Sequence, residues 1–308
     1  MRIVTALGGN ALVRRGERMT ADSQRENLKS AVKALASLIV DGHNLIITHG
    51  NGPQVGLLAL QSLAGPADGS YPLDILGAES EGMIGYMIEQ ELHNVLPGER
   101  LIATLLTQIR VAHDDPAFAN PSKPIGPVYT ESEARRFARE RGWAVVPDGK
   151  CWRRAVPSPE PLEILETHVI DYLVRGDITV ICAGGGGIPV VRSESGGLLG
   201  VEAVIDKDLA SALLASNLGV DHLLLLTDVD AVYSGWATPE SQPIHNATPC
   251  TLDLEEFAPG SMRPKVEAAI RFVRETGKAA SIGSIDDAPA ILASRAGTTV
   301  APSASEVP

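Results

Sequence analysis

The sequence predicts an α/β fold built on a parallel sheet with helices on its faces. Four short aliphatic runs, at residues 3–7, 45–48, 179–183 and 223–227, each lead into a turn rich in glycine or aspartate. Strands that alternate with such turns and with helical stretches are typical of parallel sheets. Hydrophobic residues make up 44% of the 308 residues but aromatic ones only 4%. The core must therefore be aliphatic, which suits parallel strands buried on both faces.

Three segments have the sequence pattern of helices. The first starts with a capping box at residues 23–26, continues with apolar side chains at helical spacing, and ends near Gly42, where a C-terminal cap belongs. Residues 208–218 are rich in alanine and leucine, which favours a second helix. A single apolar stripe between Pro264 and Gly277 indicates the third.

The stretch from about residue 114 to residue 161 departs from this pattern. It is rich in proline and charge, most clearly at residues 120–124 and 157–161. The length of the chain allows either two domains or one large α/β unit. We predict one domain over residues 1–300, with a small subdomain, residues 114–161, protruding from it. Residues 301–308 are polar and are expected to form a frayed tail.

Charge and cysteine content exclude several classes of protein. The net charge of −12 argues against a nucleic-acid partner, because an acidic protein repels a phosphate backbone. Cys151, Cys182 and Cys250 are far apart and lack metal-ligand spacing, so we expect reduced thiols in a cytoplasmic protein. The first apolar run, residues 3–7, is too short for a signal peptide or a membrane span.

The turns after the aliphatic runs predict a site for an anion. Ligands of open parallel sheets bind at the carboxyl ends of the strands, and glycine lets the backbone approach an anion closely. No GxxxxGK[ST] or GxGxxG motif is present, so phosphates must be held in another way. Lys123, Lys207 and Lys265 adjoin glycine, proline or acidic residues at the boundaries of elements, which makes them candidates for that task.

Nine segments carry a resemblance to a known family. They are ALGGNAL (6–12), THGNGPQVG (48–56), GAESEGMIGY (77–86), NPSKPIGPVY (120–129), RRAVPSPEP (153–161), CAGGGGIPV (182–190), GVEAVIDKDLASALLA (200–215), LTDVDAVY (226–233) and GSMRPKVEAA (260–269). In these segments, which run in order from about residue 2 to residue 300, the chain resembles the carbamate kinases of the amino-acid kinase superfamily. The segments at 120–129 and 182–190 are the ones more particular to carbamate kinases.

The resemblance implies a three-layer α/β/α sandwich around a mostly parallel sheet, with the nucleotide bound by the part from about residue 200. It implies catalytic roles for Lys123, Lys207, Asp208 and Lys265. Substrate binding would involve Gly8, Gly9, Asn10, Gly50 and Asn51. The nucleotide would be bound by Lys207, Asp228, Tyr233, Met262 and Lys265.

The chemistry agrees with the resemblance. Carbamate already has an anionic oxygen, so the reaction with ATP needs no general base to create the nucleophile. Catalysis then consists of positioning and of neutralising charge on the transferring phosphoryl group, which lysines, backbone amides and Mg²⁺ can do. We expect Mg²⁺ to enter with ATP or ADP, carried mainly by the nucleotide phosphates, and the sequence identifies no metal ligands.

Other side chains have two interpretations. His49 could be a base, or it could hold its turn by a hydrogen bond. Cys182 could be a nucleophile, or a buried thiol at a strand end. Glu79 and Glu81 could bind metal, or could simply start a helix; Asp228 and Asp230 could bind Mg²⁺, or shape the nucleotide loop.

Three wider expectations follow. A homodimer is implied by the family, and the apolar residues 83–88 could supply contact surface, although they could equally be core. The resemblance also implies a role in arginine breakdown, running from carbamoyl phosphate and ADP toward ATP. The alternatives are a kinase of the same fold for another small acid and a non-catalytic nucleotide sensor. One departure from the family is the loop at residues 235–239, which lacks a lysine that carbamate kinases often have there.

Overall fold

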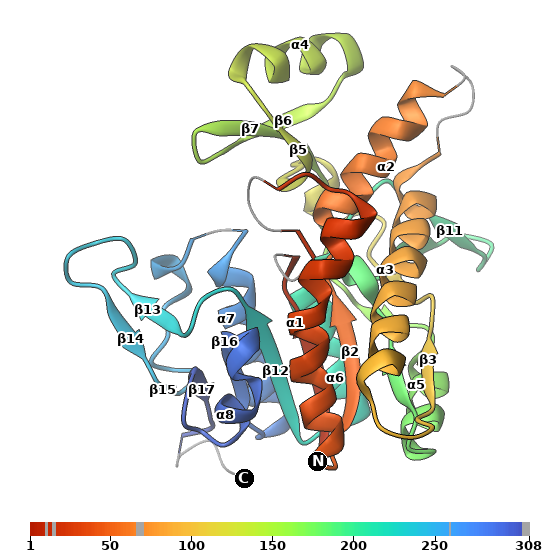
Figure 1. Ribbon diagram of the computed structural model, residues 1–308. Coiled ribbons are helices and arrows are strands. Elements are labelled where there is room, and N and C mark those ends of the chain that lie inside the picture. The colour runs from red at the N-terminus through yellow and green to blue at the C-terminus, as the bar shows by residue number, and fades with distance from the viewer. Residues whose placement is uncertain (10–11, 14–16, 66–70, 259, 304–308) are drawn as a thin grey trace.

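The computed structural model describes residues 1–9, 12–13, 17–65, 71–258 and 260–303. Its main sheet has eight strands in the order β15-β17-β16-β12-β1-β2-β9-β3 (Figure 1). Their bounds are Asn246–Ala247 (β15), Thr298–Val300 (β17), Ala280–Ser284 (β16), His222–Thr227 (β12), Arg2–Leu7 (β1), Asn44–His49 (β2), Thr179–Ile181 (β9) and Ile102–Thr104 (β3). Every pairing is parallel except that of β16 with β17. The predicted mostly parallel sheet is confirmed.

Helices cover both faces of this sheet, so the predicted three-layer sandwich is also confirmed. Within β1, Ile3 and Leu7 pack with α1 (Ala21–Val40), α3 (Leu73–Val95) and α8 (Ala288–Leu292). Val4 and Ala6 point to the opposite face and pack with α5 (Thr167–Arg175), α6 (Lys207–Leu218) and α7 (Met262–Thr276). Alternate residues of one strand therefore serve two separate cores, as the two-residue period of a strand requires.

The helices predicted at 208–218 and 264–277 are confirmed as α6 and α7, and Gly277 caps α7 in the left-handed conformation. The predicted start of the first helix is wrong by about three residues. Thr20 is the N-cap of α1, and the capping box joins Thr20 to Ser23, whose backbone N–H donates to Thr20 Oγ1 over 3.2 Å. Ser23 is thus the third residue of the helix rather than its cap.

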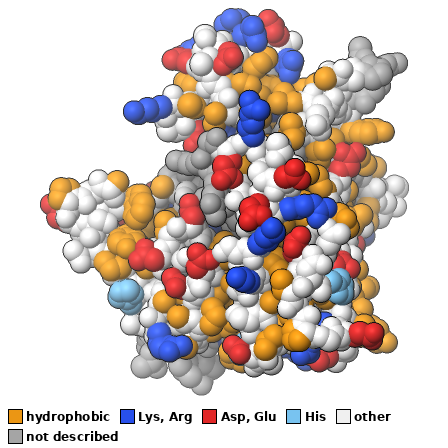
Figure 2. Space-filling model, in the orientation of Figure 1, with side chains coloured by type: hydrophobic (Ala, Val, Ile, Leu, Met, Phe, Trp, Pro, Cys, Tyr) orange, Lys and Arg blue, Asp and Glu red, His pale blue; other side chains and the backbone are white. Residues whose placement is uncertain are grey.

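A separate antiparallel sheet forms a protruding unit within the stretch predicted as a subdomain (Figure 1). It consists of β5 (Lys123–Tyr129), β7 (Cys151–Val156) and β6 (Ala144–Asp148), with α4 (Glu131–Arg141) packed on it. Three partly buried aromatic rings pack together in it: the ring of Phe137 lies 5.0 Å from that of Tyr129 and 5.3 Å from that of Trp143. Lys and Arg side chains are prominent on the outside of this unit, at the top of Figure 2.

The protruding unit touches the main body through α2 (Gly52–Ala64) by a contact between backbones. A Cβ atom added to Gly56 would lie 1.9 Å from the Cα of Gly126 in β5, so only glycine fits there.

Two further small sheets complete the fold. One has the order β11 (Leu198–Gly200), β10 (Ile188–Arg192), β4 (Gln108–Arg110) and β8 (Glu163–Ile164). The other is the hairpin of β13 (Val232–Ser234) and β14 (Gln242–Ile244). Of the predicted tail at 301–308, residues 304–308 lie outside the described part of the chain. No helix among the described residues has the length and apolarity needed to cross a membrane.

Candidate functional site

The predicted turns meet at one edge of the main sheet. The backbone N–H of Gly8 donates to Leu226 O over 2.9 Å, and that of Gly50 donates to Leu7 O over 3.1 Å. A Cβ atom on Gly50 would lie 3.3 Å from the backbone nitrogen of Gly9. The turns that follow β1, β2 and β12 therefore form one continuous backbone surface, at the end of the sheet where such folds bind ligands.

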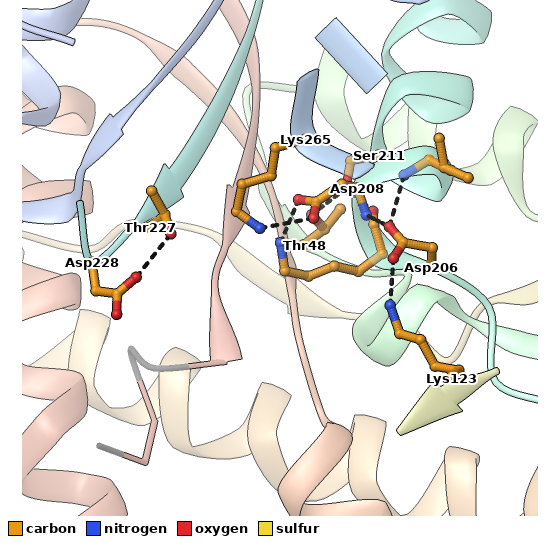
Figure 3. A network of polar contacts seen from close by, with 10 residues as sticks. Thr48, Lys123, Asp206, Asp208, Ser211, Thr227, Asp228 and Lys265 are labelled. Carbon is orange, nitrogen blue, oxygen red and sulfur yellow. Dashed lines mark hydrogen bonds and ion pairs between the residues drawn. The ribbon is translucent and has the colours of Figure 1, made fainter. Parts of the chain in front are cut away.

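Asp208 joins two of the predicted lysines beside this surface (Figure 3). Lys207 Nζ lies 2.5 Å from Asp208 Oδ1, and Lys265 Nζ lies 2.9 Å from Asp208 Oδ2. Lys207 and Asp208 begin α6, whereas Lys265 lies in the first turn of α7. Two helix starts thus bring two ammonium groups to one buried carboxylate, and the cluster keeps a net positive charge that suits an anion.

Burial and the ion pairs act against each other in this cluster. Burial disfavours the charged carboxylate of Asp208, but Lys207 and Lys265 outweigh it and hold the pKa of Asp208 below its usual range. Burial lowers the pKa of Lys207 to about 8, although Asp208 opposes this change. Burial also acts to lower the pKa of Lys265, but the combined attraction of Asp208 and two further aspartates outweighs it and raises that pKa. Lys207 is therefore the more easily deprotonated of the two lysines.

Lys123 reaches the same helix start from the protruding unit. Its ammonium group forms an ion pair with Asp206, the N-cap residue of α6 (Figure 3). The other carboxylate oxygen of Asp206 accepts hydrogen bonds from the backbone N–H groups of Asp208, at 2.9 Å, and Leu209, at 3.4 Å. The structure thus brings the three predicted lysines together around the start of α6.

The predicted substrate residues lie beside the cluster, with one exception. A Cβ atom on Gly50 would lie 3.6 Å from Lys207 Cδ, so the glycine turn and the lysine side chain are in contact. Asn51 is buried, and its Nδ2 donates to Ser80 Oγ over 2.8 Å. Asn10, the remaining predicted residue, lies outside the described residues.

The other residues predicted to bind the nucleotide differ in their relation to the cluster. The charge of Asp228 contributes to the raised pKa of Lys265. Met262 is the first residue of α7, three positions before Lys265. Tyr233 donates to both carboxylate oxygens of Asp230, each at 3.0 Å, in the hairpin whose loop carries Trp236. No bond that we observe joins Tyr233 to the lysine cluster.

The structure favours one interpretation for several of the residues that had two. His49 Nδ1 bonds to Gly50 O over 3.2 Å, and burial lowers the pKa of His49 to about 4, which fits a neutral imidazole that holds its turn. Burial raises the pKa of Cys182, which fits an inert thiol. Glu81 is fully buried in mid-helix whereas Glu79 is exposed, so they neither face one site nor start α3.

The sequence analysis missed one charged residue of the site. Asp206 received no role there, although it both caps α6 and pairs with Lys123. The available signal was its place two residues before the predicted helix start, near the N-cap position that aspartate favours. Within the described ranges no group of three or more His, Cys, Asp or Glu side chains is arranged to hold a metal ion.

Comparisons with known proteins point to one family. The pattern described as the amino acid kinase family matches residues 1–284. A carbamate kinase of Rhizobium meliloti is 53% identical, over 100% of this chain and 95% of the relative. One of Haemophilus influenzae is 54% identical, over 97% and 96%.

Solved structures agree. The carbamate kinase of Giardia lamblia bound to citric acid superimposes with a TM-score of 0.92 at 40% identity, and its complex with AMP-PNP with a TM-score of 0.88 at 39% identity. Each comparison covers 98% of both chains. The likeness therefore extends over the whole chain.

Proposed function

The chain belongs to the carbamate kinases of the amino acid kinase family, and from that membership we propose that it transfers a phosphoryl group reversibly between ATP and carbamate. The observation that carries this proposal is the buried Lys207–Asp208–Lys265 cluster at the edge of the main sheet, with Lys123 beside it. Such a site concentrates positive charge where a phosphoryl group would develop negative charge.

The reaction needs no proton transfer to start. An anionic oxygen of carbamate forms a bond to the γ-phosphorus of ATP, while the bond from that phosphorus to the β–γ bridging oxygen breaks and leaves ADP with the electron pair. Lys207 and Lys265 would bind phosphoryl oxygens, and Asp208 would hold the two ammonium groups in place. Lys123 would contact the transferring group, which carries its charge on the equatorial oxygens.

The two substrates would bind on opposite sides of the cluster. Gly8, Gly9, Asn10, Gly50 and Asn51 would hold carbamate through the backbone surface at the ends of β1 and β2. Asp228, Tyr233 and Met262 would contact the nucleotide near the start of α7. The complex of the Giardia lamblia enzyme with AMP-PNP supports a nucleotide site in this fold.

Mg²⁺ would accompany the nucleotide. Asp206 and Asp208 are both engaged by lysines, so these carboxylates are poorly suited to hold a metal. This agrees with Mg²⁺ carried on the nucleotide phosphates, where it would neutralise charge on the β- and γ-oxygens.

Further parts of the proposal concern organisation and context. We propose a single domain over residues 1–300 with the unit at 114–161 closing over the site. We also propose a cytoplasmic homodimer that acts in arginine breakdown in the direction of ATP formation. Of the suggested contact residues, Ile84, Met87 and Ile88 are buried in the core and only Tyr86 is exposed. The dimer thus rests on the family alone, and a monomer mass by light scattering at micromolar protein would refute it.

A coupled assay tests the reaction. The purified protein is mixed with ADP, Mg²⁺ and carbamoyl phosphate, and ATP is detected; in the reverse direction, a panel of small acids is offered with ATP. We expect ATP formation from carbamoyl phosphate and no comparable turnover with other acids. Faster turnover of another acid would favour the related kinase, and ADP binding without any turnover would favour a nucleotide sensor.

A further inference from the structure

Glu81 is a buried carboxyl group that the reaction above does not use. It lies in the middle of α3, is only 1% exposed, and forms no ion pair with the described residues. Its two oxygens instead accept backbone N–H groups: Oε1 from Gly184, at 2.8 Å, and Oε2 from Thr107, at 3.2 Å. One side chain thus joins the segments that follow β3 and β9.

The segment held by Glu81 is the glycine loop at residues 183–187. Ala183 and Gly185 to Gly187 all have left-handed φ angles, of 49°, 67°, 91° and 83°. Glycine adopts such angles at little cost, whereas Ala183 does so at a cost that surrounding contacts must offset. Thr107 adds one such contact, because its Oγ1 accepts the backbone N–H of Ala183 over 2.9 Å.

The 183–187 loop packs between Asn51 and the segment that leads into α6. A Cβ atom on Gly185 would lie 2.0 Å from Asn51 Nδ2, and one on Gly186 would lie 2.4 Å from Ile205 O, directly before Asp206. A Cβ atom on Gly184 would lie 2.4 Å from His49 Nε2, for which no hydrogen-bond partner is found among the described residues. A displaced loop would therefore move Asn51 and the start of α6.

We propose that Glu81 is a positioning residue: by holding the 183–187 loop, it fixes Asn51 and the start of α6 in the geometry that binds the acid substrate. This inference rests on the proposed function. It states that the geometry of the acid-binding part of the site depends on a residue that lies outside the site. Ser80, the neighbour of Glu81 in α3, accepts a hydrogen bond from Asn51 directly. One turn of α3 thus fixes both Asn51 and the loop that covers it.

The electrostatic setting of Glu81 supports this role. Burial raises its pKa to about 8, although the N–H groups of Thr107 and Gly184 oppose this change. Each oxygen of Glu81 accepts one of these N–H groups, so the carboxyl group is committed to the two backbone segments.

The test compares Glu81→Gln with Glu79→Gln, an exposed position on the same helix. Glutamine keeps the size of glutamate but has one acceptor oxygen, so it can hold Gly184 or Thr107 but not both. We expect KM for carbamoyl phosphate to rise about tenfold, equal to about 1.4 kcal/mol, with Kd for ADP within twofold of wild type. Glu79→Gln should change neither constant. If Glu81 had a purely structural role, the substitution would lower the melting temperature without raising KM for carbamoyl phosphate selectively over Kd for ADP.

Hydrogen exchange separates this inference from the proposed function. The amides of residues 183–187 should exchange faster in Glu81→Gln than in Glu79→Gln, whichever acid the enzyme uses. If Glu81→Gln does not fold, Thr107→Val decides, because it removes the bond to Ala183 and should raise the same KM about threefold. An unchanged KM with unchanged loop exchange, or an equal loss of ADP affinity, would overturn the inference. A wild type that makes no ATP from carbamoyl phosphate would overturn only the proposed function.

Discussion

The lysines of the site belong to two regions that hold them differently. The side chains of Lys207 and Lys265 are 10% and 11% exposed and share one buried carboxylate within the main body. Lys123 is 26% exposed, comes from the protruding unit, and pairs with Asp206. The buried pair is therefore part of the folded core, whereas Lys123 adds its charge from outside the sheet. We therefore expect substitutions in the buried pair to lower both stability and turnover, and a substitution of Lys123 to lower mainly turnover.

The way each region is built supports this division. The buried pair is fixed by the starts of α6 and α7, where helix geometry and burial leave little freedom. Lys123 is the first residue of β5 and precedes Pro124, whose ring restricts the backbone. Gly126 lies against Gly56 of α2, and Ile125 is buried in an apolar cluster with residues of α2 and α3. The protruding unit is therefore packed against the main body, and it presents Lys123 at the start of β5.

The largest effect is expected for Asp208→Asn. It leaves Lys207 and Lys265 buried without their shared counterion, and breaking a buried pair from one side costs about 3–5 kcal/mol. We expect the free energy of unfolding to fall by about that amount and turnover to fall on the order of 1000-fold. Urea denaturation and the coupled assay measure the two quantities. A loss of stability below about 1 kcal/mol would show that the cluster is not the charge centre described above.

Lys207→Ala and Lys265→Ala should lower turnover by several hundred-fold while the protein stays folded. Each removes one positioned charge, and the loss of a single such contact commonly costs on the order of 100- to 1000-fold in kcat. Asp208 keeps one ammonium partner in either variant, so the stability cost should be smaller than for Asp208→Asn. Near wild-type kcat at saturating Mg²⁺ and nucleotide would remove the lysine concerned from the mechanism.

Lys123→Ala should lower kcat by about 100-fold with little change in stability. The lost charge acts on the transferring phosphoryl group, whereas Asp206 keeps its two backbone N–H donors, so the loss of stability should be smaller than for Asp208→Asn. Steady-state kinetics and thermal melting provide the comparison. If Lys123 were only a surface side chain of the protruding unit, kcat would stay unchanged.

The pH dependence should distinguish the buried pair in a further way. Lys207 is charged below its pKa of about 8 and neutral above it, so kcat/KM should fall as pH rises through about 8, by up to tenfold per pH unit. Lys207→Arg should remove that fall, because arginine stays protonated. Glu81 also titrates near pH 8, and Glu81→Gln should leave the fall in place. A profile that stays flat to pH 9.5 in the wild type would contradict the assignment.

The smallest effect is expected on the outer surface of the protruding unit. Arg135 pairs with Glu131 on α4, and both side chains are more than half exposed. Solvent screens such pairs, so Arg135→Ala should leave kcat within twofold of wild type. It also serves as the matched control for Lys123→Ala, because both remove one positive charge from the same unit. A tenfold loss would mean that the charge of the whole unit, and not Lys123 alone, acts on the substrate.

Much of the fold could be predicted because local patterns decide it. The aliphatic runs became β1, β2, β9 and β12, because a parallel sheet covered by amphipathic helices buries such segments on both faces. The start of α1 was placed too late because Ser23 is suitable both as an N-cap and as the third residue of a capping box. Only the observed bond to Thr20 distinguishes these positions.

The site divides in the same way. Lys207 and Lys265 could be singled out from their positions at the boundaries of elements, whereas the role of Asp208 was implied only by the family resemblance. The pairing of Lys123 with Asp206 and the contact of Glu81 with Gly184 could not be predicted, because each contact joins segments that are far apart in the chain. Glu79 and Glu81 look alike in sequence, and only packing against the 183–187 loop makes one exposed and the other a buried acceptor.

The most direct test of this division is the affinity for ADP of two variants. Calorimetric titration of ADP with Mg²⁺ into Lys123→Ala should give a Kd within twofold of wild type, because that lysine acts on the transferring group alone. The same titration into Lys265→Ala should give a Kd at least tenfold weaker, because Lys265 would also bind the nucleotide phosphates. An equal loss of affinity in both variants would contradict the account, since it would place Lys123 in the nucleotide pocket with the buried pair.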